Sequence, residues 1–270
     1  MNAHYIFLLF SSISFFLSSC KAKSTISPYH LHEETITYQI DSLQMKSYIV
    51  YNDQITTKRP AVLVVPEWWG LNEYAKSRAR QLAALGYIAI AVDMYGNGKT
   101  AANPGEASAA AGPFYQNPIM AKKHVDAAIA QIKLHPNTDP SKIAAIGYCF
   151  GGGVLLNIAR MGEELKGFVS FHGSLLGTPL NKDLLKTKIL VLHGAADKFV
   201  SASDVATFKQ QMDSIGADYS FKRYAGATHA FTNPEATATG KKFNLPIAYN
   251  AAADSASWNE MKKFLNQVFK

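Results

Sequence analysis

The sequence has 270 residues, of which 48% are hydrophobic and 17% charged, which is enough for one large core. The formal net charge is +7. The lysines occur as scattered pairs, however, and no basic run is long enough to form a nucleic-acid-binding patch. We therefore expect one large folded domain that has no nucleic-acid partner.

The chain begins with an apolar run that ends at one of its two cysteines. The stretch YIFLLFSSISFFLSSC, at residues 5–20, is short for a transmembrane helix and is typical of a secretory signal peptide. Its end, Leu-Ser-Ser-Cys at 17–20, resembles a bacterial lipobox, although no lysine or arginine precedes the apolar run. We predict a signal peptide over residues 1–19, lipidation of Cys20 and a polar tether over 20–32. A plain cleaved signal peptide and an uncleaved anchor are the alternatives.

Lipidation at Cys20 implies a place in the bacterial cell envelope, attached to the membrane through lipid on the periplasmic side. Lys21, and not an aspartate, follows Cys20. By analogy with enterobacterial sorting, this favours the outer membrane over the inner one. With Cys20 modified, the remaining cysteine, Cys149, has no partner for a disulfide.

The rest of the chain reads as one α/β domain over residues 33–270. Residues 33–51 alternate in polarity and predict an antiparallel hairpin. The predicted strands that follow are residues 61–65, 87–92, 142–147, 167–171, 188–194 and 218–224, and the predicted helices are 72–85, 118–134, 151–161, 203–215 and 254–269. Apolar strands that alternate with amphipathic helices predict a mostly parallel central sheet with helices on both faces, whose functional residues gather at the carboxyl ends of the strands.

The stretch Gly-Tyr-Cys-Phe-Gly, at residues 147–151, lies between a predicted strand and a predicted helix. This is the context of a nucleophile elbow, here with Cys149 in place of the commoner serine. The glycines permit a strained turn that presents the sulfur at the amino end of a helix, where an anion is favoured. A P-loop requires a lysine and a Ser or Thr after the glycines, and a dinucleotide-binding fingerprint requires glycine where Cys149 stands. Neither motif fits this stretch.

Two partners for Cys149 follow later strands. Asp197 comes just after the strand predicted at 188–194, and His229 lies in a loop of small residues after the strand at 218–224. The chain order of nucleophile, acid and histidine is the order found in α/β hydrolases. In such a triad His229 takes the thiol proton, and Asp197 holds the imidazole and stabilises its charged form.

Five segments together resemble the dienelactone hydrolases: PEWWGLN (66–72), VDMYGNG (92–98), GYCFGG (147–152), HGAADKFV (193–200) and GATHAFTNPEA (226–236). The resemblance runs from about residue 33 to the end of the chain. It implies a monomer with the α/β-hydrolase fold, a triad of Cys149, Asp197 and His229, and no cofactor. The implied reaction is the cysteine-dependent hydrolysis of small carboxylic esters or lactones.

The resemblance also implies roles for residues around the triad. Glu67 would pair with the resting nucleophile and help to deprotonate it, unless it serves only as an edge salt bridge. The backbone N–H groups of Phe150 and Trp68 would form the oxyanion hole. We expect Trp68, Trp69, His172 and Phe231 to line the acyl pocket, and His193 to be structural. No ligand spacing indicates a metal.

The sequence departs from the family at two substrate-binding positions. Dienelactone hydrolases hold the substrate carboxylate with two arginines, and Asn97 and Asn233 occupy these positions here. A neutral amide binds a carboxylate more weakly than a guanidinium does, so we predict neutral substrates, unless another basic residue such as Arg223 substitutes. An amide or peptide hydrolase with the same triad and a non-catalytic ligand-binding lipoprotein are the alternatives. A thiol-redox role is disfavoured because no resolving cysteine is available.

Overall fold

The computed structural model describes residue 1 and residues 30–270. Apart from residue 1, the predicted signal peptide lies outside the described residues, as do the predicted lipidation site Cys20 and most of the predicted tether. The domain itself begins with β1 at Leu31, two residues before the predicted boundary. Within the described part of the chain, none of the helices combines the length and the apolar character needed to cross a membrane.

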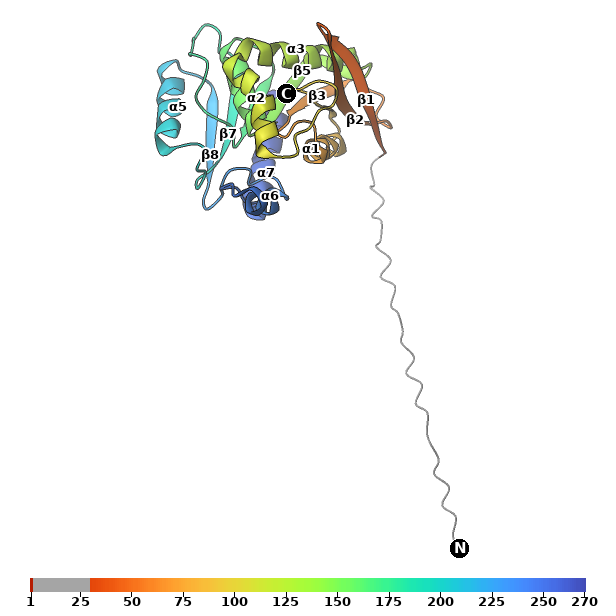
Figure 1. The fold of residues 1–270 in the computed structure, drawn as a ribbon. Helices are drawn as coiled ribbons and strands as arrows, with labels where there is room; N and C mark the ends of the chain where they lie inside the picture. Colours follow the sequence, from red (N-terminus) through yellow and green to blue (C-terminus); the bar gives the residue numbers. More distant parts are fainter. Residues whose placement is uncertain (2–29) are drawn as a thin grey trace.

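One eight-stranded sheet organises the molecule (Figure 1). Its order is β1-β2-β4-β3-β5-β6-β7-β8. The strands are β1 (Leu31–Ile40), β2 (Leu43–Asn52), β3 (Arg59–Val65), β4 (Ile88–Ala91), β5 (Thr138–Tyr148), β6 (Gly167–Phe171), β7 (Lys188–Gly194) and β8 (Tyr219–Tyr224). The pairs β1–β2 and β2–β4 are antiparallel, whereas every pair from β4 to β8 is parallel. This confirms the predicted mostly parallel sheet and the edge hairpin.

The helices cover both faces of the sheet. They are α1 (Glu73–Ala84), α2 (Pro104–Gln116), α3 (Pro118–Leu134), α4 (Phe150–Arg160), α5 (Ala202–Ser214), α6 (Ala236–Phe243) and α7 (Ala251–Val268). All five predicted helices are present within three residues of the predicted bounds. The sequence reading missed α2 and α6.

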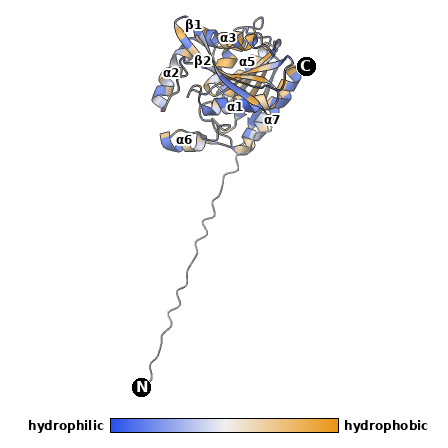
Figure 2. Ribbon diagram, turned by 90° about the vertical axis from the view of Figure 1, so that its right-hand side faces the viewer, coloured by the Kyte–Doolittle hydropathy of each residue, from blue (hydrophilic) through white to orange (hydrophobic). Residues whose placement is uncertain are grey.

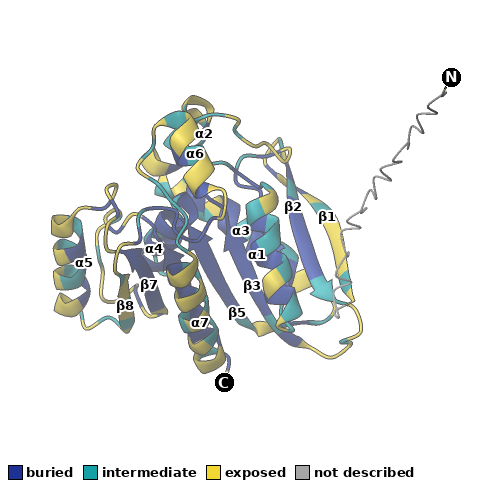
Figure 3. Cartoon of the chain, turned by 90° about the horizontal axis from the view of Figure 1, so that it is seen from below, coloured by how far each residue is buried: buried dark blue, intermediate teal, exposed yellow. Residues whose placement is uncertain are grey.

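Alternating residues of the central strands supply the two halves of the core. In β3, Leu63 and Val65 pack with residues of α3, α4 and α5, whereas Val62 and Val64 pack with residues of α1 and α7. Successive side chains of a strand point to opposite faces, so a strand covered on both faces must be apolar throughout. Figure 2 shows the hydrophobic strands inside the layers of helices, and Figure 3 shows that these strands are buried while the outer sides of α5 and α7 are exposed.

Candidate active site

The elbow that carries Cys149 joins the end of β5 to the start of α4. Cys149 has φ 51° and ψ −112°, a conformation that L-residues rarely adopt. A Cβ at Gly147 would collide with the backbone of Gly151, and a Cβ at Gly151 would collide with the carbonyl group of Val65. Glycine is therefore required on both sides of the cysteine, because the turn brings β3, β5 and α4 into direct backbone contact.

The structure brings the three predicted triad residues together at the carboxyl ends of their strands. His229 Nδ1 lies 2.8 Å from Asp197 Oδ2, and both side chains are buried. Asp197 Oδ1 also accepts the backbone N–H of Phe199 at 2.8 Å. Because the carboxylate only accepts hydrogen bonds, Nδ1 carries a proton, and the other ring nitrogen is left for the nucleophile.

The charge state of His229 suits thiol chemistry. Burial by itself lowers the pKa of this imidazole, but the charge on Cys149 and the hydrogen bonds to Asp197 and Cys149 raise it more strongly, to about 10. The protonated ring is therefore the favoured form beside an ionised sulfur. A thiol beside a protonated imidazole is the arrangement that cysteine nucleophiles use in acyl transfer.

The two backbone N–H groups predicted to form the oxyanion hole have no acceptor in the described part of the protein. Phe150 is the first residue of α4, so its N–H has no acceptor within the helix. Trp68 lines the cavity that contains Cys149, and its carbonyl oxygen accepts a hydrogen bond from Tyr95 Oη at 2.9 Å. Among the described residues, neither N–H group donates a hydrogen bond to another protein group. Both are therefore available to a ligand.

Glu67 lines the same cavity as Cys149 and His229. Its Oε2 accepts a hydrogen bond from Asn233 Nδ2 at 2.8 Å. The structure thus assigns Asn233 as a partner of this carboxylate, and no ion pair with Glu67 occurs in the described part of the chain. Burial raises the pKa of Glu67 to about 7, while the hydrogen bond from Asn233 and the charges of His229 and Arg78 limit the rise.

The catalytic cavity has a volume of about 290 Å³. Five members of its wall are residues that the sequence predicts for the site: Cys149, His229, Glu67, Trp68 and Trp69. The others were not foreseen, and they are Ser108, Gly112, Tyr115, Ser174, Phe199, Ala230, Leu245 and Ile247. Ser108, Gly112 and Tyr115 share one face of α2, at spacings of four and three residues. No lysine or arginine belongs to the wall.

Three residues predicted to bind substrate lie outside this cavity. Asn97 is exposed in a tight turn with φ 56°, where its backbone N–H donates to the carbonyl oxygen of Gln44 at 2.7 Å. Asn233 is buried beside Glu67 and also caps a turn, accepting the N–H of Glu235 at 3.0 Å. Phe231 is fully buried against Tyr224 and Ala253. None of the three lines the cavity that contains Cys149, and their contact with the substrate stays a prediction.

His172 is likewise behind the cavity and not in its wall. Its Nδ1 accepts the backbone N–H of Cys149 at 3.1 Å, and its Nε2 lies 2.8 Å from Thr232 Oγ1. Burial, with the charges of His229 and Arg78, holds the pKa of His172 well below its usual range. The neutral ring therefore supports the elbow from behind, which corrects its assignment as pocket lining.

His193 and Arg223 belong to a separate groove. Both line it on the outer side of Asp197, and neither lines the catalytic cavity. His193 is buried and its ring packs 5.7 Å from that of Phe221. Arg223 is therefore not positioned to replace the missing arginines. Among residues 30–270, no cluster of three or more His, Cys, Asp or Glu side chains is arranged to hold a metal ion.

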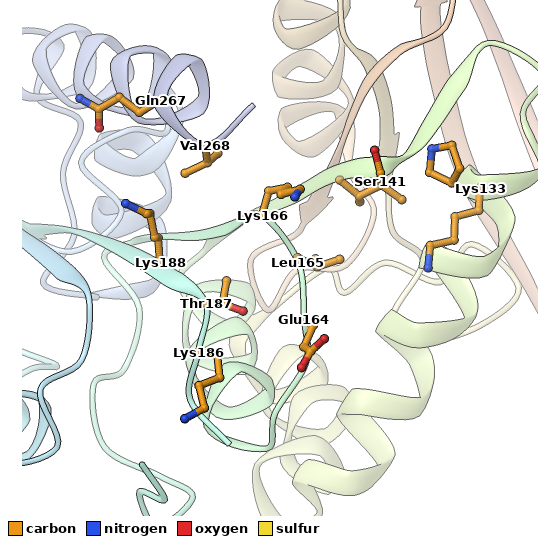
Figure 4. A pocket seen from close by; sticks show the side chains of 12 residues that line it. Lys133, Ser141, Glu164, Leu165, Lys166, Lys186, Thr187, Lys188, Gln267 and Val268 are labelled. Atoms are coloured by element: carbon orange, nitrogen blue, oxygen red, sulfur yellow. The ribbon is translucent and has the colours of Figure 1, made fainter. Parts of the chain in front are cut away.

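A larger groove of about 610 Å³ lies elsewhere on the molecule (Figure 4). Lys133, Lys166, Lys186 and Lys188 line it together with Glu164. These residues lie at or near the amino ends of strands, so the groove is at the edge of the sheet opposite Cys149. It contains no predicted catalytic residue.

Comparison with known proteins decides the family. The model of the dienelactone hydrolase family matches residues 45–269. The chain belongs to this family. A Yersinia pestis relative that carries the name carboxymethylenebutenolidase is 30% identical over 257 residues, which cover 88% of each chain. The solved structure of a dienelactone hydrolase-like promiscuous phosphotriesterase from metagenomic libraries is 31% identical, with a TM-score of 0.84, and the match covers 89% of this chain and 100% of that one.

Membership in the dienelactone hydrolase family makes the protein a hydrolase of ester or lactone bonds with the α/β-hydrolase fold. A probable lactonase from Bradyrhizobium sp. is also similar, at 26% identity over 223 residues, which cover 78% of this chain and 85% of the relative. The family assignment agrees with the five segments quoted from the sequence, all of which lie within the matched residues 45–269.

Proposed function

We propose that this dienelactone hydrolase family member is a cysteine-dependent hydrolase of small neutral carboxylic esters or lactones. The observation that carries the proposal is the juxtaposition of Cys149 and the His229–Asp197 pair in a cavity whose wall contains no lysine or arginine. The first feature supports acyl transfer to sulfur. The second supports uncharged substrates, because a buried carboxylate requires a charged partner or strong hydrogen-bond donors.

The geometry supports a two-step mechanism. In the first step His229 Nε2 holds the thiol proton, and the thiolate of Cys149 attacks the carbonyl carbon. The N–H groups of Phe150 and Trp68 receive the resulting oxyanion. The imidazolium then protonates the leaving alkoxide as the C–O bond breaks, which leaves a thioester on the sulfur. In the second step the neutral ring removes a proton from water, the hydroxide attacks the thioester, and the thiolate departs.

Glu67 has a supporting electrostatic role in this proposal. It shares the cavity with Cys149, and its pKa of about 7 places its change of charge in the physiological range. A neutral Glu67 leaves the thiolate–imidazolium pair undisturbed, whereas an ionised Glu67 favours the protonated sulfur. The carboxyl group thus adjusts the reactivity of the nucleophile without being consumed.

A panel of chromogenic esters, lactones and amides tests the proposal. The wild type should hydrolyse the esters and lactones, and Cys149→Ala should not. Amide turnover that exceeds ester turnover would favour a peptide hydrolase instead. Tight binding without turnover of any substrate would favour a ligand-binding protein that keeps the fold.

A second candidate reaction is the hydrolysis of neutral phosphotriesters. The structure of a promiscuous phosphotriesterase matches 89% of this chain at 31% identity. The absence of lysine and arginine from the cavity wall suits a neutral triester as well as a neutral carboxylic ester. Diethyl p-nitrophenyl phosphate is the appropriate probe. Cys149-dependent release of p-nitrophenol from it would establish this activity beside the esterase.

For the amino-terminal segment we propose lipidation at Cys20 and attachment to the periplasmic side of the bacterial envelope, with the outer membrane favoured. The Leu-Ser-Ser-Cys sequence and Lys21 support this proposal. Fractionation of cells that express wild type and Cys20→Ser tests it.

A further inference from the structure

A second hollow adjoins the catalytic cavity. This groove has a volume of about 580 Å³. It is formed by the end of α2, the start of α3, one side of α4 and the loop after β6. Its wall includes Tyr115, Ile119, Asn157, Ser174 and Leu176. We call it the α2–α4 groove.

The α2–α4 groove and the catalytic cavity share part of their walls. Tyr115 and Ser174 line both hollows. Tyr115 extends from the cavity-facing side of α2, and its ring packs 5.4 Å from that of Phe150, the residue that follows the nucleophile. The two hollows therefore meet within one side chain of the elbow.

The wall of the groove is mainly apolar, and its polar members are Gln116, Asn157, Ser174 and Thr178. No charged residue lines it. Three of its side chains are large, hydrophobic and unusually exposed: Tyr115 (50%), Ile119 (72%) and Leu176 (41%). Its polar Asn157 is occupied by accepting the N–H of Thr178 at 2.7 Å. Exposed apolar surface that gathers in one hollow marks a binding site for an apolar ligand.

The position of the groove relative to His229 indicates whether it binds the acyl chain or the leaving group of an ester. The leaving group of an ester must lie against His229, which donates the proton to it. The wall of the groove comes from α2, α3, α4 and the loop after β6, and it includes neither His229 nor Asp197, so the groove is on another side of the cavity from the proton donor. We propose that the α2–α4 groove binds the acyl chain of an ester whose carbonyl group lies at Cys149. The substrates are accordingly neutral esters with an extended apolar acyl chain. This inference rests on the proposed esterase function and defines its substrate more narrowly.

A chain-length series measures the contribution of the groove. Each methylene that is fully buried increases affinity about fourfold. The groove is open on one side, so we expect about twofold per methylene. For p-nitrophenyl esters, kcat/KM should then rise about sixteenfold over the four methylenes from butanoate to octanoate in the wild type.

Two variants place a charge in the groove. Ile119→Glu and Leu176→Glu should each reduce the octanoate-to-butanoate ratio of kcat/KM to about 2 or less, because a carboxylate beside the chain must be desolvated. Leu134→Glu and Leu184→Glu are matched controls, since these leucines are 75% and 45% exposed and line neither hollow. Both controls should keep the wild-type ratio. Ile119→Ser provides a milder change, and thermal unfolding verifies that each variant is folded.

The outcomes separate this inference from the function on which it rests. A wild type that hydrolyses no ester, or a Cys149→Ala variant that keeps its activity, would refute the proposed function. Cys149-dependent hydrolysis with a flat chain-length series would refute the groove alone. A rising series that Ile119→Glu and Leu176→Glu leave unchanged would show that the chain binds elsewhere.

Discussion

The carboxyl group of Glu67 makes the stability of this protein depend on pH. It is 3% exposed, and burial raises its pKa from 4.5 to about 7. Between these two pH values the folded state holds a proton that the unfolded state has released. Stability contributed at this site therefore falls as the pH rises from about 4.5 through 7. Replacing Glu67 with Gln removes the titration but keeps a side-chain oxygen for the hydrogen bond from Asn233.

The size of the effect follows from the shift. At 1.36 kcal/mol per pKa unit, the rise from 4.5 to about 7 corresponds to roughly 3 kcal/mol. Between pH 5 and pH 8, Glu67→Gln should therefore gain roughly 2–3 kcal/mol of unfolding free energy relative to the wild type, as urea denaturation at each pH measures. Glu34→Gln, at an exposed position of β1, is the control and should follow the wild type. A difference between Glu67→Gln and wild type that stays constant with pH would refute the reasoning.

Three further predictions address the chemistry and the anchor. Iodoacetamide should inactivate the enzyme by alkylating Cys149, and His229→Ala should lower kcat by several orders of magnitude; unchanged ester turnover by Cys149→Ala would assign the attack to another residue. For two substrates with the same scissile ester bond, the one whose second carboxyl group is methylated should have a kcat/KM roughly a hundredfold above that of the one with a free carboxylate. The reverse order would contradict a binding site without lysine or arginine. Cys20→Ser should move from the membrane to the soluble fraction, because the lipid contributes ~0.8 kcal/mol per buried CH₂, and a variant that stays with the membrane would contradict lipidation.

The fold was predictable because each strand carries a strong local signal. Apolar runs such as residues 61–65 are buried on both faces, so they have no polar alternation and stand out from the helices between them. The elbow was predictable for a related reason. Backbone contacts leave no room for a Cβ at Gly147 and Gly151, so the turn requires glycine at both positions and can be recognised in the sequence.

The walls of the cavity were harder to predict. Helix α2 is rich in alanine and glycine and contains Pro113, so it lacks a clear apolar stripe. A start signal was nevertheless present: Asn103 caps the helix, Pro104 occupies its first turn, and the Glu106 side chain accepts the N–H of Ala102. Helix α6 has only eight residues and no side-chain cap, and the segment after it contributes Leu245 and Ile247 to the cavity.

The misplaced substrate residues show what a position at a strand end does and does not specify. His172 directly follows β6, and so it lies at the catalytic edge as predicted. Its φ of 42°, however, turns the chain so that the ring points behind the nucleophile and accepts a backbone N–H. The strand topology predicts at which edge of the sheet a residue lies. The direction of its side chain depends on the dihedral angles of the loop, which no sequence pattern predicts.

The direction of β1 has a practical consequence for handling the protein. Since β1 is antiparallel to β2, and β2 is antiparallel to β4, β1 runs in the same direction as the parallel strands. Leu31 is therefore at the amino-end edge of the sheet, whereas the mouth of the catalytic cavity is at the opposite edge. A resin, sensor surface or fusion partner joined ahead of residue 30 faces away from the mouth, so an enzyme immobilised through this end keeps its cavity open to substrate in the surrounding solution.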